Sequence, residues 1–333
     1  MKKTLYISVF LWTFTVTAVQ AQNLFPFLGG QRVGTSAVTF LKIGVGAKAT
    51  AMGGAFVALA NDASAMYWNP AGVAQVKGNE LMVAHIEWPA DIQYEYFGYV
   101  HHVPSIGSIG LSASFLHMDD MAVTTEYQPH GTGDYFGYAD MMVGLTYSLK
   151  IMDRFSFGIT GKFVREEIAE LVMQNWMMDL GTYYWTGYKS LRFAVSLVNF
   201  GPILRPEGSY YMKTKEGDLV EEQYEAFSPP TIFSIGAAME FLEKGNHSIT
   251  GSMQMNHPVD NAENVVFGTS YAFMQRFELR GGYKINFDEE KFTFGGGIRI
   301  PLAGTMLKID YSYADFNRLQ TTHQFSLSFN YDL

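Results

Sequence analysis

Apolar and polar residues alternate along much of the chain with a period of two, which is the spacing at which side chains of a β-strand point to opposite faces. The last segment shows the pattern most clearly. One set of alternate positions holds Phe325, Leu327, Phe329, Tyr331 and Leu333, and the other holds Gln324, Ser326, Ser328, Asn330 and Asp332. This pattern predicts a strand at 322–333 with one apolar face.

Charged residues in the neighbouring segments keep to the polar side of the alternation. The set consists of Glu278, Arg280, Lys284, Arg299, Lys308 and Asp310. If the apolar positions face lipid, these six residues face the interior of a barrel, where charges of both signs can pair. We therefore predict them to be lumen charges.

Fourteen segments have the character of strands. They lie at about 80–88, 92–101, 107–117, 138–149, 154–165, 176–185, 190–199, 231–241, 246–255, 263–273, 275–286, 290–300, 304–315 and 322–333. Alternation alone also suits a soluble sandwich, but the lengths of the connections favour a barrel. Short turns near 102–106, 150–153, 186–189, 242–245 and 301–303 fall on one side, and long connections at 118–137, 166–175 and 200–230 fall on the other. Bacterial outer-membrane barrels have an even strand number and this asymmetry. We predict an all-β fold, a transmembrane antiparallel β-barrel of about 14 strands over residues 80–333.

The first residues predict export. Lys2 and Lys3 precede an apolar run that ends in Val19-Gln20-Ala21, which is typical of a cleaved signal peptide over residues 1–21. No other segment has the roughly 20 consecutive apolar residues of a membrane helix. Residues 22–79 precede the first strand, and we expect them to plug the lumen. The predicted location is the outer membrane of a Gram-negative bacterium.

Composition supports a lipid-facing sheet. The chain has 33 Gly, 26 Phe and 20 Tyr, and only 17% of its residues are charged, against a usual value of about 25%. The aromatic residues Trp88, Tyr94 and Tyr96 are interpreted as part of an interfacial girdle. A net charge of −9 disfavours a nucleic-acid partner, because binding to phosphates requires a basic surface.

No motif predicts catalysis. The run Gly44-Val45-Gly46-Ala47-Lys48-Ala49 matches the residue pattern of a dinucleotide-binding motif. That motif binds a dinucleotide only within a strand–turn–helix unit. We interpret it as small residues that let the backbone pass closely inside a lumen. Arg165, Glu166, Glu167 and Glu170 are interpreted as a solvated helical turn in a loop. We expect no enzymatic activity, no cofactor and no metal site.

The connection from Gly201 to Ser228 is long and rich in charged and aromatic residues. Loops of this length are uncommon unless they are functional or disordered, and both alternatives stay open here. If the loop is functional, the candidate partner-binding residues are Tyr210, Tyr211, Glu221, Glu222 and Tyr224.

The run SAVTFLKIGVGAKATAMGGAFVALANDASAMYWNPAGVAQV, from Ser36 to Val76, resembles the start of PorV/PorQ family outer-membrane proteins. It contains their Asn-Pro-Ala element, here Asn69, Pro70 and Ala71, followed by Gly72 in the predicted plug. The resemblance continues in MDDMAVTTEYQPHGTGDYF, FGITGKFVREEIAE and VSLVNFGPIL, so it covers nearly the whole mature chain. It implies a fourteen-stranded, FadL-like barrel associated with type IX secretion.

Two functional hypotheses follow. The first is a barrel that binds and shuttles or anchors exported proteins at the cell surface, as PorV-like and PorQ-like proteins do, with outer-membrane lipid and translocon or cargo proteins as partners. The alternative is a FadL-like transporter of hydrophobic small molecules. An apolar path through the lumen would favour transport, and mutually packed lumen charges would favour a sealed anchor.

Overall fold

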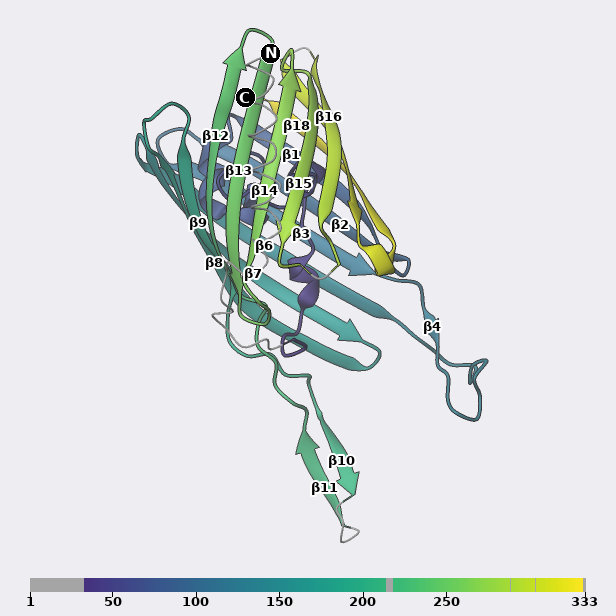
Figure 1. Cartoon of the computed structure of the whole chain (residues 1–333). Helices are drawn as coiled ribbons and strands as arrows, with labels where there is room; N and C mark the ends of the chain where they lie inside the picture. The colour runs from purple at the N-terminus through teal and green to yellow at the C-terminus, as the bar shows by residue number, and fades with distance from the viewer. Residues whose placement is uncertain (1–32, 214–217, 288, 303, 332–333) are drawn as a thin grey trace.

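The structure of the chain, a computed structural model, describes residues 33–213, 218–287, 289–302 and 304–331. The predicted signal peptide and the first residues of the predicted plug lie outside these ranges. Fourteen strands form one closed antiparallel barrel (Figure 1). They are β1 (Asn79–Trp88), β2 (Ile92–Val103), β3 (Gly107–His117), β6 (Tyr138–Met152), β7 (Phe155–Ile168), β8 (Leu171–Trp185), β9 (Arg192–Phe200), β12 (Ile232–Lys244), β13 (His247–Pro258), β14 (Asn264–Phe273), β15 (Phe277–Ile285), β16 (Phe292–Leu302), β17 (Thr305–Asp315) and β18 (Thr321–Tyr331). The predicted fold class is confirmed.

The barrel closes where its first strand meets its last. β1 and β18 pair without interruption from Asn79↔Tyr331 to Glu87↔His323. Closure leaves no sheet edge exposed, which matters because an unpaired backbone amide in hydrocarbon costs several kcal/mol. None of the helices in the described part of the chain is long and apolar enough to cross a bilayer.

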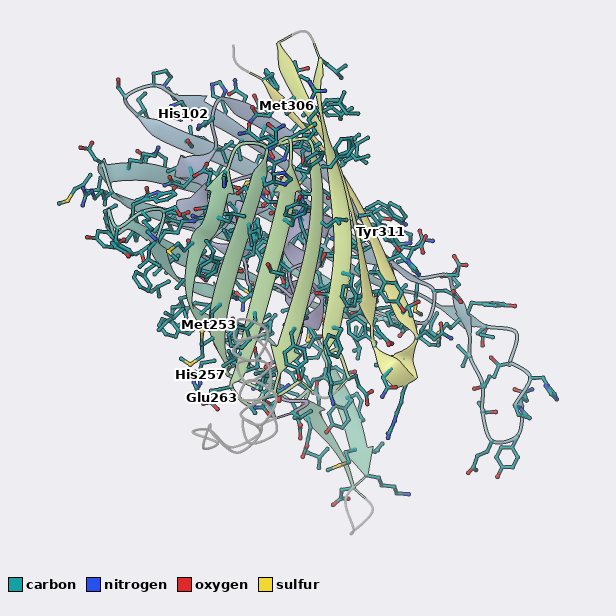
Figure 2. All side chains as sticks on the ribbon, turned by 45° about the horizontal axis from the view of Figure 1, so that its top comes forward. His102, Met253, His257, Glu263, Met306 and Tyr311 are labelled. Atoms are coloured by element: carbon teal, nitrogen blue, oxygen red, sulfur yellow. The ribbon has the colours of Figure 1, made fainter. Side chains whose placement is uncertain are left out.

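Burial alternates along the strands as the sequence pattern predicted. In β3, for example, Leu111 and Phe115 are exposed on the outer face, whereas Ser112 and Ser114 are buried on the inner face. We call the end of the barrel with short connections the short-turn end, and the opposite end the long-loop end. Figure 2 shows His102 and Met306 towards the short-turn end, and His257 and Glu263 towards the long-loop end.

One predicted loop is wrong. Residues 166–175 are not a long connection, because β7 continues to Ile168, β8 starts at Leu171, and the turn is Ala169 and Glu170. The predicted helical turn there is wrong for the same reason. The alternation of apolar and polar residues is lost at this end of the hairpin, because charged residues replace apolar ones there. Arg165 and Glu167 form an ion pair that water can reach.

The other two long connections carry small hairpins of their own. Residues 118–137 include β4 (Met121–Ala122) and β5 (Tyr135–Phe136), and residues 201–231 include β10 (Ser209–Lys213) and β11 (Leu219–Gln223). Figure 1 shows both hairpins extending away from the long-loop end.

A plug fills the lumen. It contains η2 (Thr39–Lys42), α2 (Ala47–Thr50), α3 (Ala65–Trp68) and η3 (Pro70–Gln75). The described plug begins at the long-loop end, where Ser36 pairs with Ser228 of the connection before β12, and it reaches the short-turn end at Asn79, the first residue of β1. Its apolar residues, such as Val45, Phe56 and Val73, are completely buried.

Glycines on the inner face of the wall make room for the plug. A Cβ atom at Gly158 would collide with the backbone of Pro70, and one at Gly181 would collide with the side-chain oxygen of Asn69. A Cβ at Gly268 would lie 2.8 Å from the carbonyl oxygen of Met52. The backbone of the wall therefore touches the plug directly at these positions. This packing explains part of the high glycine content that the sequence shows.

Candidate functional site

The lumen contains a cavity of about 640 Å³ on the long-loop side of the plug. We call this cavity the vestibule. Its apolar lining comes from the plug, from the inner wall and from two loops, and includes Leu41, Tyr67, Trp68, Trp88, Ile232 and Leu319. The volume lies in the range of about 300–1,000 Å³ that small-molecule sites occupy.

Aromatic side chains of the plug form the floor of the vestibule. The rings of Tyr67 and Trp68 have centroids 4.9 Å apart in an edge-to-face arrangement. Their polar atoms are already bonded to plug backbone, because Trp68 Nε1 donates to the Val45 carbonyl at 2.8 Å and the Tyr67 hydroxyl donates to the Leu41 carbonyl at 3.1 Å. The floor therefore offers ring surface rather than unused hydrogen-bonding groups.

Polar residues also line the vestibule. Lys42 of the plug forms an ion pair with Asp260 at 2.8 Å, and Lys284 forms one with Glu290 at 2.5 Å. About half of the lining residues are polar, so the vestibule places apolar ring surface next to many polar groups, an arrangement that suits an amphipathic small molecule.

The plug motif predicted at Asn69–Gly72 lies against the wall below the vestibule. Asn69 is fully buried. Its Nδ2 donates to the carbonyls of Val57 at 3.0 Å and Thr182 at 3.1 Å, and its Oδ1 accepts the Ala71 N–H at 3.1 Å. Asn69 thus joins two parts of the plug to β8, and Pro70 begins η3 directly after it. The motif holds the plug in place.

The six predicted lumen charges all occupy inward positions and have partners. Arg280 lies between Glu278 and Asp310, with an Nη1–Oδ1 distance of 2.6 Å to Asp310, and Arg299 also pairs with Glu278. Lys284 belongs to the vestibule, as described above.

Lys308 links the wall to the plug through Glu80. Lys308 Nζ lies 2.8 Å from the Glu80 carboxylate, which also accepts the N–H of Ala63 in the plug at 3.3 Å. Nearby in the plug, Lys48 lies 3.3 Å from Asp62. Burial alone would raise the pKa of Asp62, but the Lys48 ammonium group lowers it below its usual value. Glu80 thus connects the wall to the plug near the start of β1.

The predicted partner-binding residues form an isolated two-stranded hairpin. Tyr210 pairs with Glu222 and Tyr211 pairs with Glu221 across β10 and β11, and the Tyr210 ring packs against the Tyr224 ring in a tilted arrangement with ring centroids 5.3 Å apart. Every residue of the two strands is exposed, and Tyr211 retains 69% of its accessible surface. The hairpin offers aromatic and acidic side chains far from the lumen.

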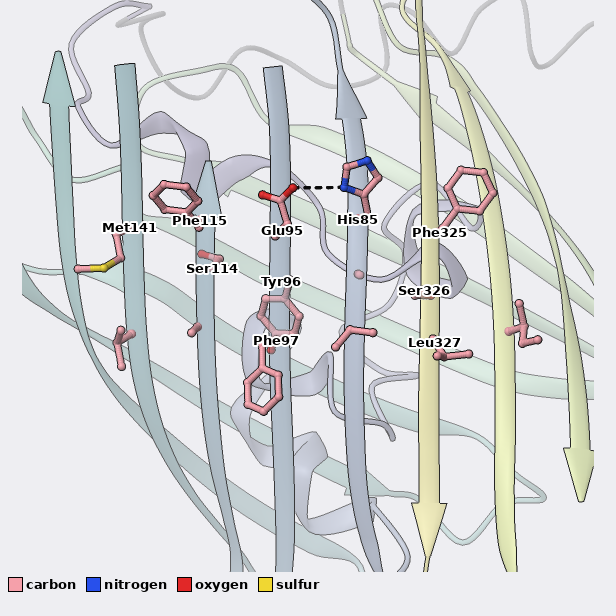
Figure 3. A pocket seen from close by; sticks show the side chains of 15 residues that line it. His85, Glu95, Tyr96, Phe97, Ser114, Phe115, Met141, Phe325, Ser326 and Leu327 are labelled. Atoms are coloured by element: carbon pink, nitrogen blue, oxygen red, sulfur yellow. Dashed lines mark ion pairs between the residues drawn. The ribbon is translucent and has the colours of Figure 1, made fainter. Parts of the chain in front are cut away.

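The outer wall also carries an open hollow of about 650 Å³ (Figure 3). Its surface is largely apolar, with Phe97, Phe115 and Phe325 on it. Glu95 lies between His85 at 3.3 Å and His117 at 3.4 Å on this face. Because the hollow lies on the outer face, where a membrane barrel meets lipid, we regard the vestibule as the stronger candidate for a ligand site.

The predicted aromatic girdle at Trp88, Tyr94 and Tyr96 is wrong. Tyr94 and Tyr96 point inward and are almost completely buried, and Trp88 packs against Phe316 with ring centroids 5.1 Å apart. The available signal was parity, since Tyr94 and Tyr96 share the inward phase of β2. Sequence reasoning also missed the vestibule, whose lining comes from segments far apart in the chain.

The described residues contain no group of three or more His, Cys, Asp or Glu side chains arranged to hold a metal ion. The run from Gly44 to Ala49 lies in the plug, where α2 contacts β16, β17 and β18. That position agrees with close packing rather than with nucleotide binding.

Comparisons with known proteins give a family match and a fold. The model of an uncharacterised protein family, UPF0164, matches residues 14–153. No curated protein sequence matches the chain.

Several solved structures have a similar fold. The Pseudomonas putida toluene transporter TodX has a TM-score of 0.57 and 12% identity, and the alignment covers 91% of this chain and 99% of that one. The Ralstonia pickettii toluene transporter TbuX has a TM-score of 0.56 and 12% identity, covering 86% and 97%. A Pseudomonas aeruginosa FadL homologue has a TM-score of 0.52 and 12% identity, covering 91% and 100%. The chain therefore has the barrel fold of these Gram-negative proteins.

Proposed function

We propose that the protein is an outer-membrane barrel that takes up a small hydrophobic molecule through the vestibule, and that it is not an enzyme. The long-loop end then faces the cell exterior and the short-turn end faces the periplasm. The vestibule carries the proposal, because it presents the ring surface of Tyr67, Trp68 and Trp88, flanked by polar groups, at an entrance to the lumen. The fold shared with toluene transporters supports it.

Passage of a ligand requires the plug to move. Below the vestibule the plug is held against the wall through Asn69, which donates to the Thr182 carbonyl, and through Glu80, which accepts the Ala63 N–H. A ligand that binds the floor at Tyr67 and Trp68 contacts the plug directly. Its binding can therefore shift the equilibrium between the docked and the displaced plug.

Ligand binding can be tested with tryptophan fluorescence, because Trp68 and Trp88 line the vestibule. We expect toluene to quench the fluorescence of the purified protein saturably. Ile232→Trp places a large ring in the vestibule, and it should weaken binding at least tenfold. Ile235→Trp is the matched control, since Ile235 lies on the outer face of the same strand.

Uptake of labelled toluene by cells that lack the gene provides the second measurement. Wild-type protein and the control variant should restore uptake, and Ile232→Trp should not. Equal uptake with and without the protein, together with no saturable quenching, would rule out this function.

A second candidate function is supported by the exposed hairpin of β10 and β11. As a PorV-like or PorQ-like protein, the barrel would shuttle or anchor exported proteins for type IX secretion, with translocon or cargo proteins bound at Tyr211 and its neighbours. A photoreactive residue at Tyr211 should then crosslink to such a protein. Deletion of the gene should remove proteins with type IX sorting domains from the cell surface. A normal surface proteome in the deletion strain argues against this role.

A further inference from the structure

Two acidic side chains lie next to each other inside the wall at the long-loop end. Asp140 of β6 and Glu166 of β7 are direct cross-strand partners, and they are only 1% and 6% exposed. Directly opposite side chains on one face have Cβ atoms about 4.5–5.5 Å apart, and like charges at this spacing repel. No sequence pattern predicts this pair, since the segment that holds Glu166 lacks the clear alternation of a strand.

Neither carboxylate has a cationic partner among the described residues, in contrast to the other buried acidic groups of the lumen. Asp179 has Lys162 at 2.8 Å, and Asp310 has Arg280. One oxygen of Asp140 accepts the Tyr138 hydroxyl at 2.6 Å, and its Oδ1 has no hydrogen-bond partner. A buried carboxylate without a compensating charge is costly.

Two buried hydroxyl groups on the strands next to Asp140 also lack hydrogen-bond partners. The hydroxyls of Tyr94 and Ser114 are buried without a hydrogen bond. Tyr94 of β2 pairs with Leu116 of β3, which pairs in turn with Asp140 of β6, and Ser114 lies two residues before Leu116 on the same face of β3. This part of the wall therefore holds several buried oxygen atoms that no hydrogen bond satisfies, and hydroxyl as well as carboxylate oxygens can act as ligands of a hard cation.

The plug reaches the same place. Glu166 Oε2 accepts the backbone N–H of Val38 at 2.7 Å, and two residues earlier the buried Ser36 hydroxyl has no hydrogen-bond partner. The acidic pair thus lies where the described plug enters the barrel.

We propose that Asp140 and Glu166 bind a divalent cation of the calcium class, with hydroxyl oxygens from the surrounding residues as neutral ligands. Ca²⁺ takes six to eight oxygen ligands in flexible geometry and accepts carboxylates together with neutral oxygens. The absence of Cys and His from the group disfavours zinc, which prefers sulfur and nitrogen ligands. Because Glu166 also holds Val38, the bound cation fixes the start of the plug to β6 and β7.

Terbium luminescence tests the site on the full-length protein in detergent, since Tb³⁺ replaces Ca²⁺ and is excited through nearby tyrosines such as Tyr138. We expect saturable luminescence that Ca²⁺ displaces and K⁺ does not. Asp140→Asn and Glu166→Gln should each weaken Tb³⁺ binding at least tenfold. The double variant Glu221→Gln, Glu222→Gln removes two exposed carboxylates of the β10–β11 hairpin and should bind as wild type does.

Thermal unfolding provides a readout that does not depend on terbium. Ca²⁺ should raise the Tm of the wild-type protein and of the hairpin control, and it should leave the Tm of Asp140→Asn unchanged. The heat-modifiable mobility of the folded barrel on gels shows that each variant is folded. Terbium binding that is equal in Asp140→Asn and wild type, or a wild-type Tm that does not respond to Ca²⁺, would overturn the proposal and indicate a carboxyl pair neutralised by protons.

Discussion

Replacement of Asn69 by alanine should loosen the plug without unfolding the barrel. The side chain makes three hydrogen bonds of 3.0–3.1 Å, to Val57, Thr182 and Ala71, in a fully buried position. A typical hydrogen bond contributes about 1 kcal/mol net, so Asn69→Ala should destabilise the docked plug by about 3 kcal/mol. Since each 1.4 kcal/mol is a factor of about ten, the equilibrium for plug opening should shift by roughly 100-fold.

Hydrogen exchange followed by mass spectrometry measures this opening directly. The N–H groups of Asn69 and Gly72 are hydrogen-bonded within the plug, and local opening determines how fast such amides exchange. We expect exchange in residues 65–76 to accelerate by about two orders of magnitude, with the strands of the wall unaffected. Asn175→Ala is the control, because it removes a side-chain hydrogen bond to Ile203 away from the plug.

Two results would contradict this reasoning. Exchange within about twofold of wild type would mean that the Asn69 hydrogen bonds do not hold the plug. Equal acceleration in the plug and in the barrel strands would mean that the plug and the wall open as one unit.

Three further predictions concern the plug and the lumen charges. Gly158→Val places side-chain atoms where the wall touches the plug backbone, so it should displace the plug and open the lumen. Channel recordings in planar bilayers should then show conductance that the wild-type protein lacks. Arg280→Met leaves the carboxylate of Asp310 without its cation and leaves Glu278 with Arg299 alone, and it should lower the free energy of unfolding in urea by about 3–5 kcal/mol. The pKa of Asp62 is lowered in the folded protein by Lys48, so the stabilisation by this pair is complete above the unfolded-state pKa of about 3.9 and is lost as the pH falls through the lower folded value. Exchange protection of the plug should therefore stay constant from about pH 7 to 5 and decrease only below about 4.

The wall of the barrel could be predicted from the sequence because lipid imposes one rule on every strand. Apolar residues such as Leu327 and Phe329 must face outward, and their spacing of two fixes the phase of each strand. The rule does not apply to parts of a strand that extend beyond the bilayer, because water surrounds both faces there. Residues 166–175 were misassigned for this reason, since a strand with polar groups on both faces shows no alternation.

The interior could be predicted only in part. The inward phase of residues such as Arg280 follows from alternation, but its partners follow from the register of neighbouring strands. That register depends on local irregularities, such as the shift between Lys150 and Met152 that sets how β6 pairs with β7. The vestibule and the Asp140–Glu166 pair bring together residues far apart in the chain, and no local pattern marks them.

The path of the plug constrains the order in which the barrel can form. The described plug runs from Ser36 at the long-loop end through the lumen to Asn79, where β1 begins. β1 pairs with β18, the last strand, so this seam closes only when the whole sheet has been made. After closure the plug is encircled by fourteen strands, and an empty barrel could be filled only by threading the chain through its mouth. The plug must therefore lie against the curling sheet before the seam closes, so it acts as a template around which the barrel is wrapped.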